Sequence, residues 1–242
     1  MEDKNNIIGR NIAFIHVPRT AGTYFASYLT NILKKKGYKI INSWENLKRD
    51  WNKKELLSFL EIKDSQPIFV HNHKENWDKE TIEKYKEEGW FLISFVRHPG
   101  DRLCSAYFMW CIKHHPEISL NDYILQLIKG IKKEKGKTIP SYWKDLDFIA
   151  EFNEKKFTFF LKKYFNHNYK LRKPINTSSN KGYKYYCKTN QISKTTQKLL
   201  KNSKDYEIYL KIFKKNKLEY YIIILKKLIQ KIFDTLFPKK PL

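Results

Sequence analysis

The segment His16–Tyr24 places an arginine, two threonines and two small residues directly after an apolar run. Ala21 and Gly22 carry little or no side chain, so the backbone can approach a ligand closely. Thr23 is a favourable N-cap for a helix Tyr24–Lys36, and the N-terminus of a helix offers unsatisfied N–H groups to an anion. The segment therefore predicts a binding loop for a phosphate-like or sulfate-like group, although the Gly-x4-Gly-Lys-Ser/Thr spacing of the common P-loop is absent. The predicted ligand residues of this loop are Pro18, Arg19, Thr20, Ala21, Gly22, Thr23 and Tyr24.

A second candidate for anion binding is Arg97, which follows the apolar run Trp90–Val96 and precedes Pro99. Ser105 lies about two turns into the helix that is predicted to follow. The planar guanidinium group matches the geometry of a phosphate, and a nearby hydroxyl adds a further donor. Taken alone, Arg97 has an alternative role in an ion pair with a carboxylate such as Asp101.

A third group, His71-Asn72-His73, follows the apolar segment Gln66–Val70. Strands and helices alternate along this half of the chain, which indicates a parallel sheet with right-handed crossovers. In such sheets, ligands bind beyond the carboxyl ends of the strands. The three groups should therefore converge on one site if their strands are neighbours.

The whole chain, 1–242, is predicted to be one α/β domain with a central parallel sheet flanked by helices and a mostly helical C-terminal half. Predicted strands are an apolar run ending at Val17, Tyr38–Ile41, Gln66–Val70 and Trp90–Val96. Predicted helices are Tyr24–Lys36, Asn52–Ile62, Asp78–Glu88, Gly100 to about His114, Leu120–Lys129, Ser141–Glu151, Glu154–Phe165, Ile192–Lys201, Tyr206–Lys214 and Leu218–Phe237. The long segment Leu171–Asn190 is predicted to be a functional loop.

The charge balance is strongly basic, with 48 Lys and Arg against 25 Asp and Glu and a net charge of +23. This charge favours an anionic partner, but a compositional bias toward Lys, Asn, Ile and Tyr explains it equally well. The three cysteines give no disulfide framework and suit a reducing compartment. We find no signal peptide and no apolar run long enough to span a bilayer, and we therefore expect a cytoplasmic protein.

These motifs together resemble the sulfotransferases that use 3′-phosphoadenosine 5′-phosphosulfate (PAPS). His16–Thr23 is similar to their 5′-phosphosulfate loop, and Arg97–Tyr107 is similar to their 3′-phosphate motif. Within that family, the resemblance is nearest to the carbohydrate 2-O-sulfotransferases of the heparan sulfate type, and it covers about residues 12–214. Three further stretches resemble this group, namely His71–His73, Leu146–Phe152 and Lys204–Tyr209.

The resemblance implies a P-loop-like α/β fold, PAPS as co-substrate, adenosine 3′,5′-bisphosphate (PAP) as product, and no metal. It implies His73 as the base that takes the acceptor proton, with His71 as its support or alternate. Arg19 stands where the family usually has lysine; it can stabilise a leaving phosphate, but its high pKa makes it unsuitable as a general acid. The loop Leu171–Asn190 resembles the segment that closes over the nucleotide, and Lys181 is its candidate ligand.

The expected acceptor is a carbohydrate hydroxyl, for which an acidic glycan would fit the charge, and we expect no nucleic acid partner. Two alternatives remain: a nucleotide-dependent kinase of similar architecture, and a non-catalytic binder of acidic glycan or nucleic acid. The basic tail Lys215–Leu242 lies outside the resemblance. Its helical part, Tyr220–Phe237, is predicted either to contact an anionic membrane surface or to pack on the domain or on a second copy.

Overall fold

The computed structural model describes residues 7–20, 22–42, 50–130, 139–152, 154–167 and 181–236. Its centre is a five-stranded sheet in the order β2-β3-β1-β4-β5, in which every neighbouring pair is parallel. All residues of β1 and β4 are buried, because helices cover both faces of the sheet and the strands are correspondingly apolar. The strands are β1 (Ile12–His16), β2 (Lys39–Asn42), β3 (Ile68–His73), β4 (Phe91–Val96) and β5 (Phe148–Glu151).

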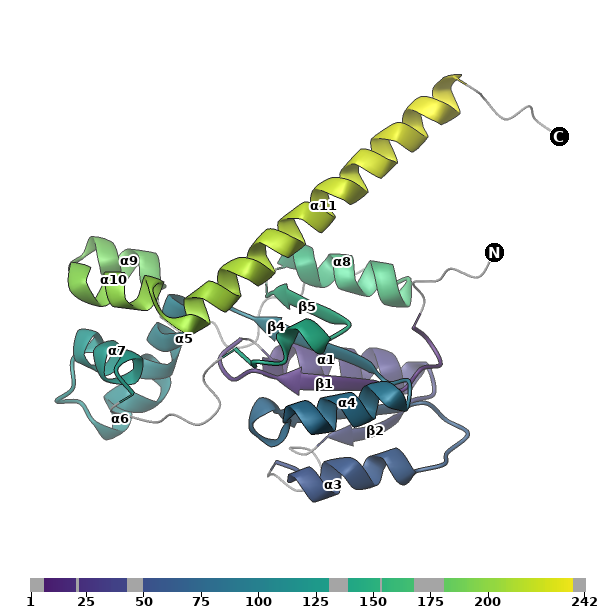
Figure 1. Ribbon diagram of the computed structural model, residues 1–242, viewed down its shortest axis with the longest axis horizontal. Helices are drawn as coiled ribbons and strands as arrows, with labels where there is room; N and C mark the ends of the chain where they lie inside the picture. The colour runs from purple at the N-terminus through teal and green to yellow at the C-terminus, as the bar shows by residue number, and fades with distance from the viewer. Residues whose placement is uncertain are drawn as a thin grey trace.

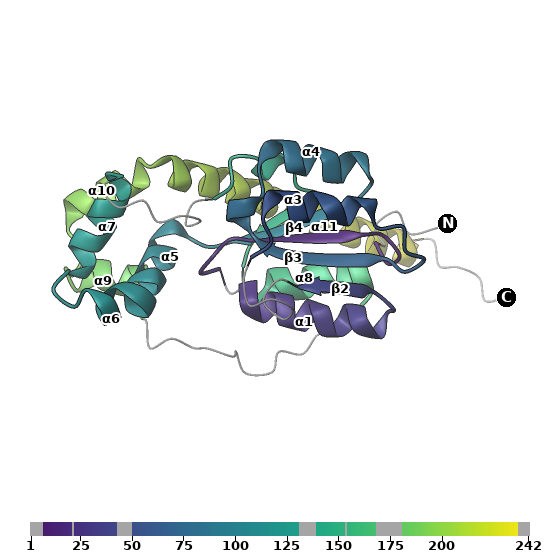
Figure 2. The same cartoon turned by 90° about the horizontal axis from the view of Figure 1, so that it is seen from below.

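Two layers of helices cover the sheet, as Figure 2 shows from its edge. α1 (Gly22–Lys35) and α8 (Glu154–Phe165) lie on one face, where α1 contributes Phe25, Leu29 and Leu33 at helical spacing to a core rich in phenylalanine. α3 (Lys53–Ser58), α4 (Lys79–Glu87) and the first part of α11 (Lys204–Leu236) lie on the other face. The parallel sheet predicted from the sequence is thus confirmed, with helices on both of its faces.

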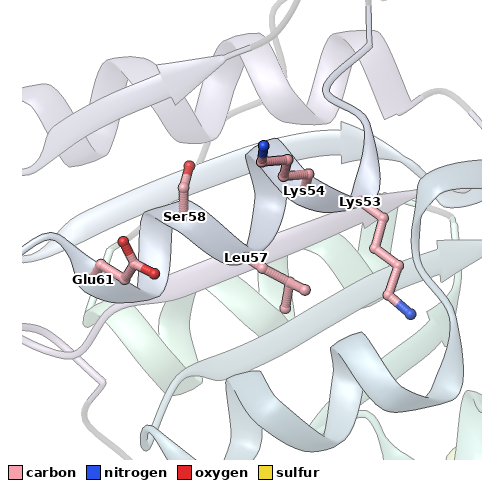
Figure 3. Close-up of a pocket in the computed structure, with 5 residues that line it drawn as sticks. All are labelled: Lys53, Lys54, Leu57, Ser58 and Glu61. Carbon is pink, nitrogen blue, oxygen red and sulfur yellow. The ribbon is translucent and has the colours of Figure 1, made fainter.

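α3 and α4 are joined at the surface by Lys53, whose ammonium group lies 2.7 Å from Asp78 Oδ2 and 2.7 Å from Glu80 Oε2. Figure 3 shows Lys53 extending toward the neighbouring helix while Lys54 points away from it. Exposed ion pairs of this kind contribute little to stability, about 0–1 kcal/mol each. The hollow over α3 is lined by Lys53, Lys54, Leu57, Ser58 and Glu61, none of which belongs to the predicted site.

A third group of helices lies beyond the carboxyl ends of the strands, beside the sheet (Figures 1 and 2). It has a hydrophobic cluster of its own, which includes Leu103, Tyr123 and Tyr186. This group lies next to the carboxyl-terminal end of the sheet, where the predicted site lies. Its members are α5 (Pro99–Ala106), a π-helical turn (Tyr107–Cys111), α6 (Ile112–His114), α7 (Leu120–Ile128), α9 (Tyr183–Lys188) and α10 (Lys194–Lys201).

Several predicted elements differ from those observed. The predicted helix Ser141–Glu151 is wrong: a 3₁₀ turn at Trp143–Asp145 leads into β5, because Phe148, Ile149 and Ala150 pair with β4 inside the core. A short apolar segment of this kind does not distinguish strand from helix by periodicity.

The boundaries of other elements also change. The predicted helix that begins at Gly100 is interrupted by the π-helical turn, and the two predicted C-terminal helices form one continuous α11. α9 lies inside the predicted loop Leu171–Asn190, of which residues 171–180 are outside the described part of the chain. In Figure 1, the C-terminal half of α11 projects away from the sheet.

Candidate active site

The predicted anion-binding loop lies between β1 and α1. Thr20 is buried and donates its hydroxyl hydrogen to the carbonyl oxygen of Val17 at 2.6 Å, which closes the turn. Arg19 has φ of 65°, a left-handed conformation that is costly for a residue other than glycine and that is often found at functional sites. Pro18 is half-buried, and Thr23 is exposed in the first turn of α1. Ala21 lies outside the described residues, and Tyr24 packs edge-on against Phe157 in the core below.

Arg19 joins the loop to the second predicted motif. Its Nη2 and Nε donate to Ser105 Oγ on α5 at 2.8 and 3.3 Å, across 86 positions of sequence. Burial, followed by the charge of Arg97, lowers the pKa of Arg19, so the two guanidinium groups are close enough to repel. In the described part of the chain, neither arginine forms an ion pair with a carboxylate. A bound anion would relieve this repulsion, and the pair therefore suits a phosphate-bearing ligand.

The start of α5 is held by His98 and Tyr183. His98 Nδ1 accepts the N–H of Gly100 at 3.1 Å, with Pro99 in the first turn. Burial lowers the pKa of His98, which favours the neutral form that this capping contact needs. Asp101 Oδ1 accepts the N–H of Tyr183 at 2.6 Å, so the carboxylate holds α9, and no ion pair joins it to Arg97 among the described residues.

Lys181, the predicted nucleotide ligand, lies just before α9. Its ammonium group is 4.6 Å from the centre of the Tyr185 ring and 3.4 Å from the hydroxyl of that residue. The position of α9 on α5 brings this lysine into the group of helices beside the predicted site, but no described contact joins Lys181 to Arg19 or Arg97. Residues 171–180 of the predicted closing loop lie outside the described residues.

Polar residues form a row on the face of the sheet that carries α1. The strand register pairs Asn42 with His71 and His16 with His73, and alternate residues of a strand point to the same face. His71 Nδ1 lies 3.1 Å from Asn42 Oδ1, and His71 Nε2 lies 3.2 Å from His16 Nδ1. The rings of His16 and His73 have centroids 4.4 Å apart. A cavity of about 410 Å³ is lined by His16, Thr23, Ala26, Ser27, Asn42, His71 and His73.

The two histidines of the predicted His-x-His motif differ in their surroundings. His71 is buried inside β3, both of its ring nitrogens are in hydrogen bonds, and burial lowers its pKa to about 3. The pKa of His16 is also well below its usual range, chiefly because of burial and then because of His71. Both are therefore neutral at pH 7 and serve as hydrogen-bonding groups. The side chain of His73 keeps 16% of its surface exposed and lies 2.7 Å, Nδ1 to Oδ1, from Asp50.

Sequence reasoning missed Asp50, His16 and Asn42. His16 lies in the segment that resembles the 5′-phosphosulfate loop, but its contacts depend on the pairing of β1 with β3, which the sequence does not reveal. Asp50 lies 23 positions before His73, and no local pattern marks it. Arg102 is buried and pairs with Asp205 at the start of α11, which indicates a structural role.

No helix in the described ranges is both long and apolar enough to cross a membrane. Within the same ranges, no three His, Cys, Asp or Glu side chains come together as a metal site would require.

Comparison with solved structures gives matches of low sequence identity. A structure of mouse sulfotransferase SULT7A1 complexed with PAP is similar at 16% identity and a TM-score of 0.40, over 66% of this chain and 58% of that chain. A structure of the PezAT chromosomal toxin–antitoxin system of Streptococcus pneumoniae is similar at 9% identity and a TM-score of 0.32, over 84% of this chain and 91% of that chain. The chain thus spans less than two thirds of the mouse protein, and no curated protein matches it.

The family match covers most of the chain. The model described as "Sulfotransferase family" matches residues 9–219, a range that contains the predicted anion-binding loop, the histidine row and α5. The chain therefore belongs to the sulfotransferase family.

Proposed function

We propose that this protein transfers a sulfuryl group from PAPS to a hydroxyl group of a carbohydrate. The observation that carries the proposal is the contact of Arg19 with Ser105, because it joins the two predicted phosphate motifs and brings the charge of Arg97 beside them. The loop would hold the 5′ end of the nucleotide, and Arg97 with Ser105 would hold its 3′-phosphate. PAPS supplies the activated sulfuryl group.

The residues of the chain then perform positioning, proton transfer and charge stabilisation. His73 accepts the proton of the acceptor hydroxyl, whose oxygen bonds to sulfur while the bond from sulfur to the phosphate oxygen breaks. Arg19 stabilises the negative charge that develops on the departing phosphate. His71 is less suited to the role of base, because it is buried and both of its ring nitrogens are engaged. An acidic glycan would suit the net charge of +23.

Ligand-dependent melting tests the nucleotide half of the proposal. PAP at about 100 times its Kd should add about 2.7 kcal/mol to the free energy of unfolding. For a chain of this size, that corresponds to a rise in Tm of roughly 5–10 °C. ATP with Mg²⁺ should give no comparable shift. Arg97→Ala should abolish the shift, whereas the matched Arg10→Ala should retain it, because Arg10 contacts Gly89 at the opposite end of the sheet.

Transfer of ³⁵S from labelled PAPS tests the chemical half. Desulfated heparin, chondroitin and a simple glycoside serve as acceptors, with His73→Ala as the variant. The proposal predicts labelled product with at least one glycan, and a loss of about 10²–10⁴-fold in the variant. No PAP-dependent shift together with no labelled product would overturn it. A shift with ATP and Mg²⁺ alone would favour the kinase alternative.

A further inference from the structure

Asp50 and His73 form a pair at the carboxyl end of β3. Asp50 Oδ1 lies 2.7 Å from His73 Nδ1, with both side chains partly shielded from solvent. A carboxylate only accepts hydrogen bonds, so the neutral imidazole must carry its proton on Nδ1 to make this contact. The lone pair of the ring is then on Nε2. Hydrogen-bond partners fix the tautomer of functional histidines in this way.

The position of Asp50 is itself fixed by a buried residue of β3. Asn72 is fully buried; its Oδ1 accepts the N–H of Trp51 at 3.2 Å, and its Nδ2 donates to the carbonyl oxygen of Trp51 at 2.7 Å. Asn72 thus holds the chain next to Asp50 through two hydrogen bonds. Because Asn72 immediately precedes His73, the same strand carries the imidazole and fixes the segment that supplies its partner.

The plane of the imidazole is supported from a second direction. The centroid of the His16 ring lies 4.4 Å from that of the His73 ring, His71 contacts His16, and Asn42 in turn contacts His71. The side chains of His16, His71 and Asn42 are buried. Since the pKa values of His16 and His71 are lowered, this support stays uncharged at neutral pH and adds no repulsion when His73 takes up a proton.

We propose that Asp50 is the positioning residue of His73: its carboxylate holds the proton on Nδ1, keeps the lone pair of Nε2 for the acceptor hydroxyl, and stabilises the imidazolium that forms. In this step the proton of the acceptor hydroxyl passes to Nε2 of His73, and the hydroxyl oxygen bonds to sulfur. The bond from sulfur to the phosphate oxygen breaks, and PAP leaves with its electron pair. This inference rests on the proposed function in so far as it concerns catalysis. The tautomer itself can be measured without any reaction.

Asp50→Asn tests the role, with Asp64→Asn as the matched control. Asp64 makes an exposed ion pair with Lys39, and its side chain is 29% exposed against 31% for Asp50. For Asp50→Asn with desulfated heparin we expect kcat to fall by about 10²-fold, with KM for PAPS changed less than about twofold. Asp50→Glu should recover part of the loss, and Asp64→Asn should match the unaltered protein.

The ¹⁵N spectrum of His73 gives a readout that does not depend on activity. Above pH 8, the unaltered protein should show His73 with its proton on Nδ1, whereas Asp50→Asn should show a substantial fraction with the proton on Nε2. Asn72→Ala, which releases the segment at Trp51, should change the tautomer in the same direction. A proton on Nε2 in the unaltered protein, or an unchanged kcat in Asp50→Asn, would overturn the inference while leaving the proposed function intact. Absence of transfer and of PAP binding in the unaltered protein would overturn the proposed function instead.

Discussion

Gly100, in the first turn of α5, has no room for a side chain, because the ring of Tyr183 from α9 packs directly against it. Substitution of Gly100 therefore tests the packing of α9 on α5. A Cβ atom at this position would lie 2.4, 2.5 and 2.7 Å from the Cγ, Cδ2 and Cδ1 atoms of Tyr183. Real Cβ atoms essentially never approach other atoms so closely, so the ring must move in Gly100→Ala. The backbone of Tyr183 is held by the hydrogen bond from its N–H to Asp101, and its ring packs against His98. We therefore expect a loss of about 1–3 kcal/mol in the free energy of unfolding, as for other overpacked sites.

A double-mutant cycle separates this overlap from other causes. In a Tyr183→Ala background the obstructing ring is gone, so Gly100→Ala should become neutral or stabilise by up to about 1 kcal/mol, because alanine is the better helix former. Urea unfolding of the unaltered protein, the two single variants and the double variant gives the coupling free energy between positions 100 and 183, which should exceed about 1 kcal/mol in magnitude. PAP affinity should fall in Gly100→Ala if Lys181, just before α9, contacts the nucleotide. Equal effects of Gly100→Ala in both backgrounds would refute the reasoning.

Three further predictions concern the histidine row and two polar contacts. Because the pKa of His71 is lowered from 6.5 to about 3, the unfolded chain binds a proton in this pH range that the folded protein does not, and stability should fall by about 1 kcal/mol for each unit of pH between 6.5 and about 3. His71→Gln should flatten the dependence of urea midpoints on pH between 6.5 and 4, and an unchanged slope would contradict the assignment. Asp205→Asn should cost about 3–5 kcal/mol in thermal unfolding, because it leaves the buried Arg102 without its carboxylate; a loss under about 1 kcal/mol would argue against the pair. Ser105→Ala should weaken binding of PAP about tenfold in calorimetry by removing the oxygen that orients the Arg19 guanidinium, whereas Ser105→Thr should restore most of the affinity, and equal affinity in all three proteins would show that the contact is incidental.

The parts of the fold that could be predicted are those with a local physical signal. Trp90–Val96 is apolar except for Ser94 and forms the interior strand β4, and the motif after it forms α5 with Pro99 in its first turn. The segment Ser141–Glu151 has no such signal. Its residues form a strand only because β4 offers an edge to pair with, and a tertiary cause of this kind leaves no trace in local periodicity.

In the candidate site too, features with a local sequence signal could be predicted, and features that depend on tertiary contacts could not. The sequence predicted that Arg19 and Ser105 belong to one site, since both follow buried strands, and the structure brings them into contact. The resemblance favoured His73 over His71 as the base, but the residues alone could not distinguish them, because that distinction depends on which side chains border each ring. The register between β1 and β3 sets His16 against His73, and the register between β2 and β3 sets Asn42 against His71. A shift of either pairing by one residue would turn these side chains to the other face of the sheet and dismantle the row. The difference between His71, whose ring nitrogens are both hydrogen-bonded, and His73, which contacts a carboxylate, therefore results from strand pairing. That carboxylate belongs to Asp50, and the segment next to Asp50 is held by Asn72, which lies on the same strand as both histidines.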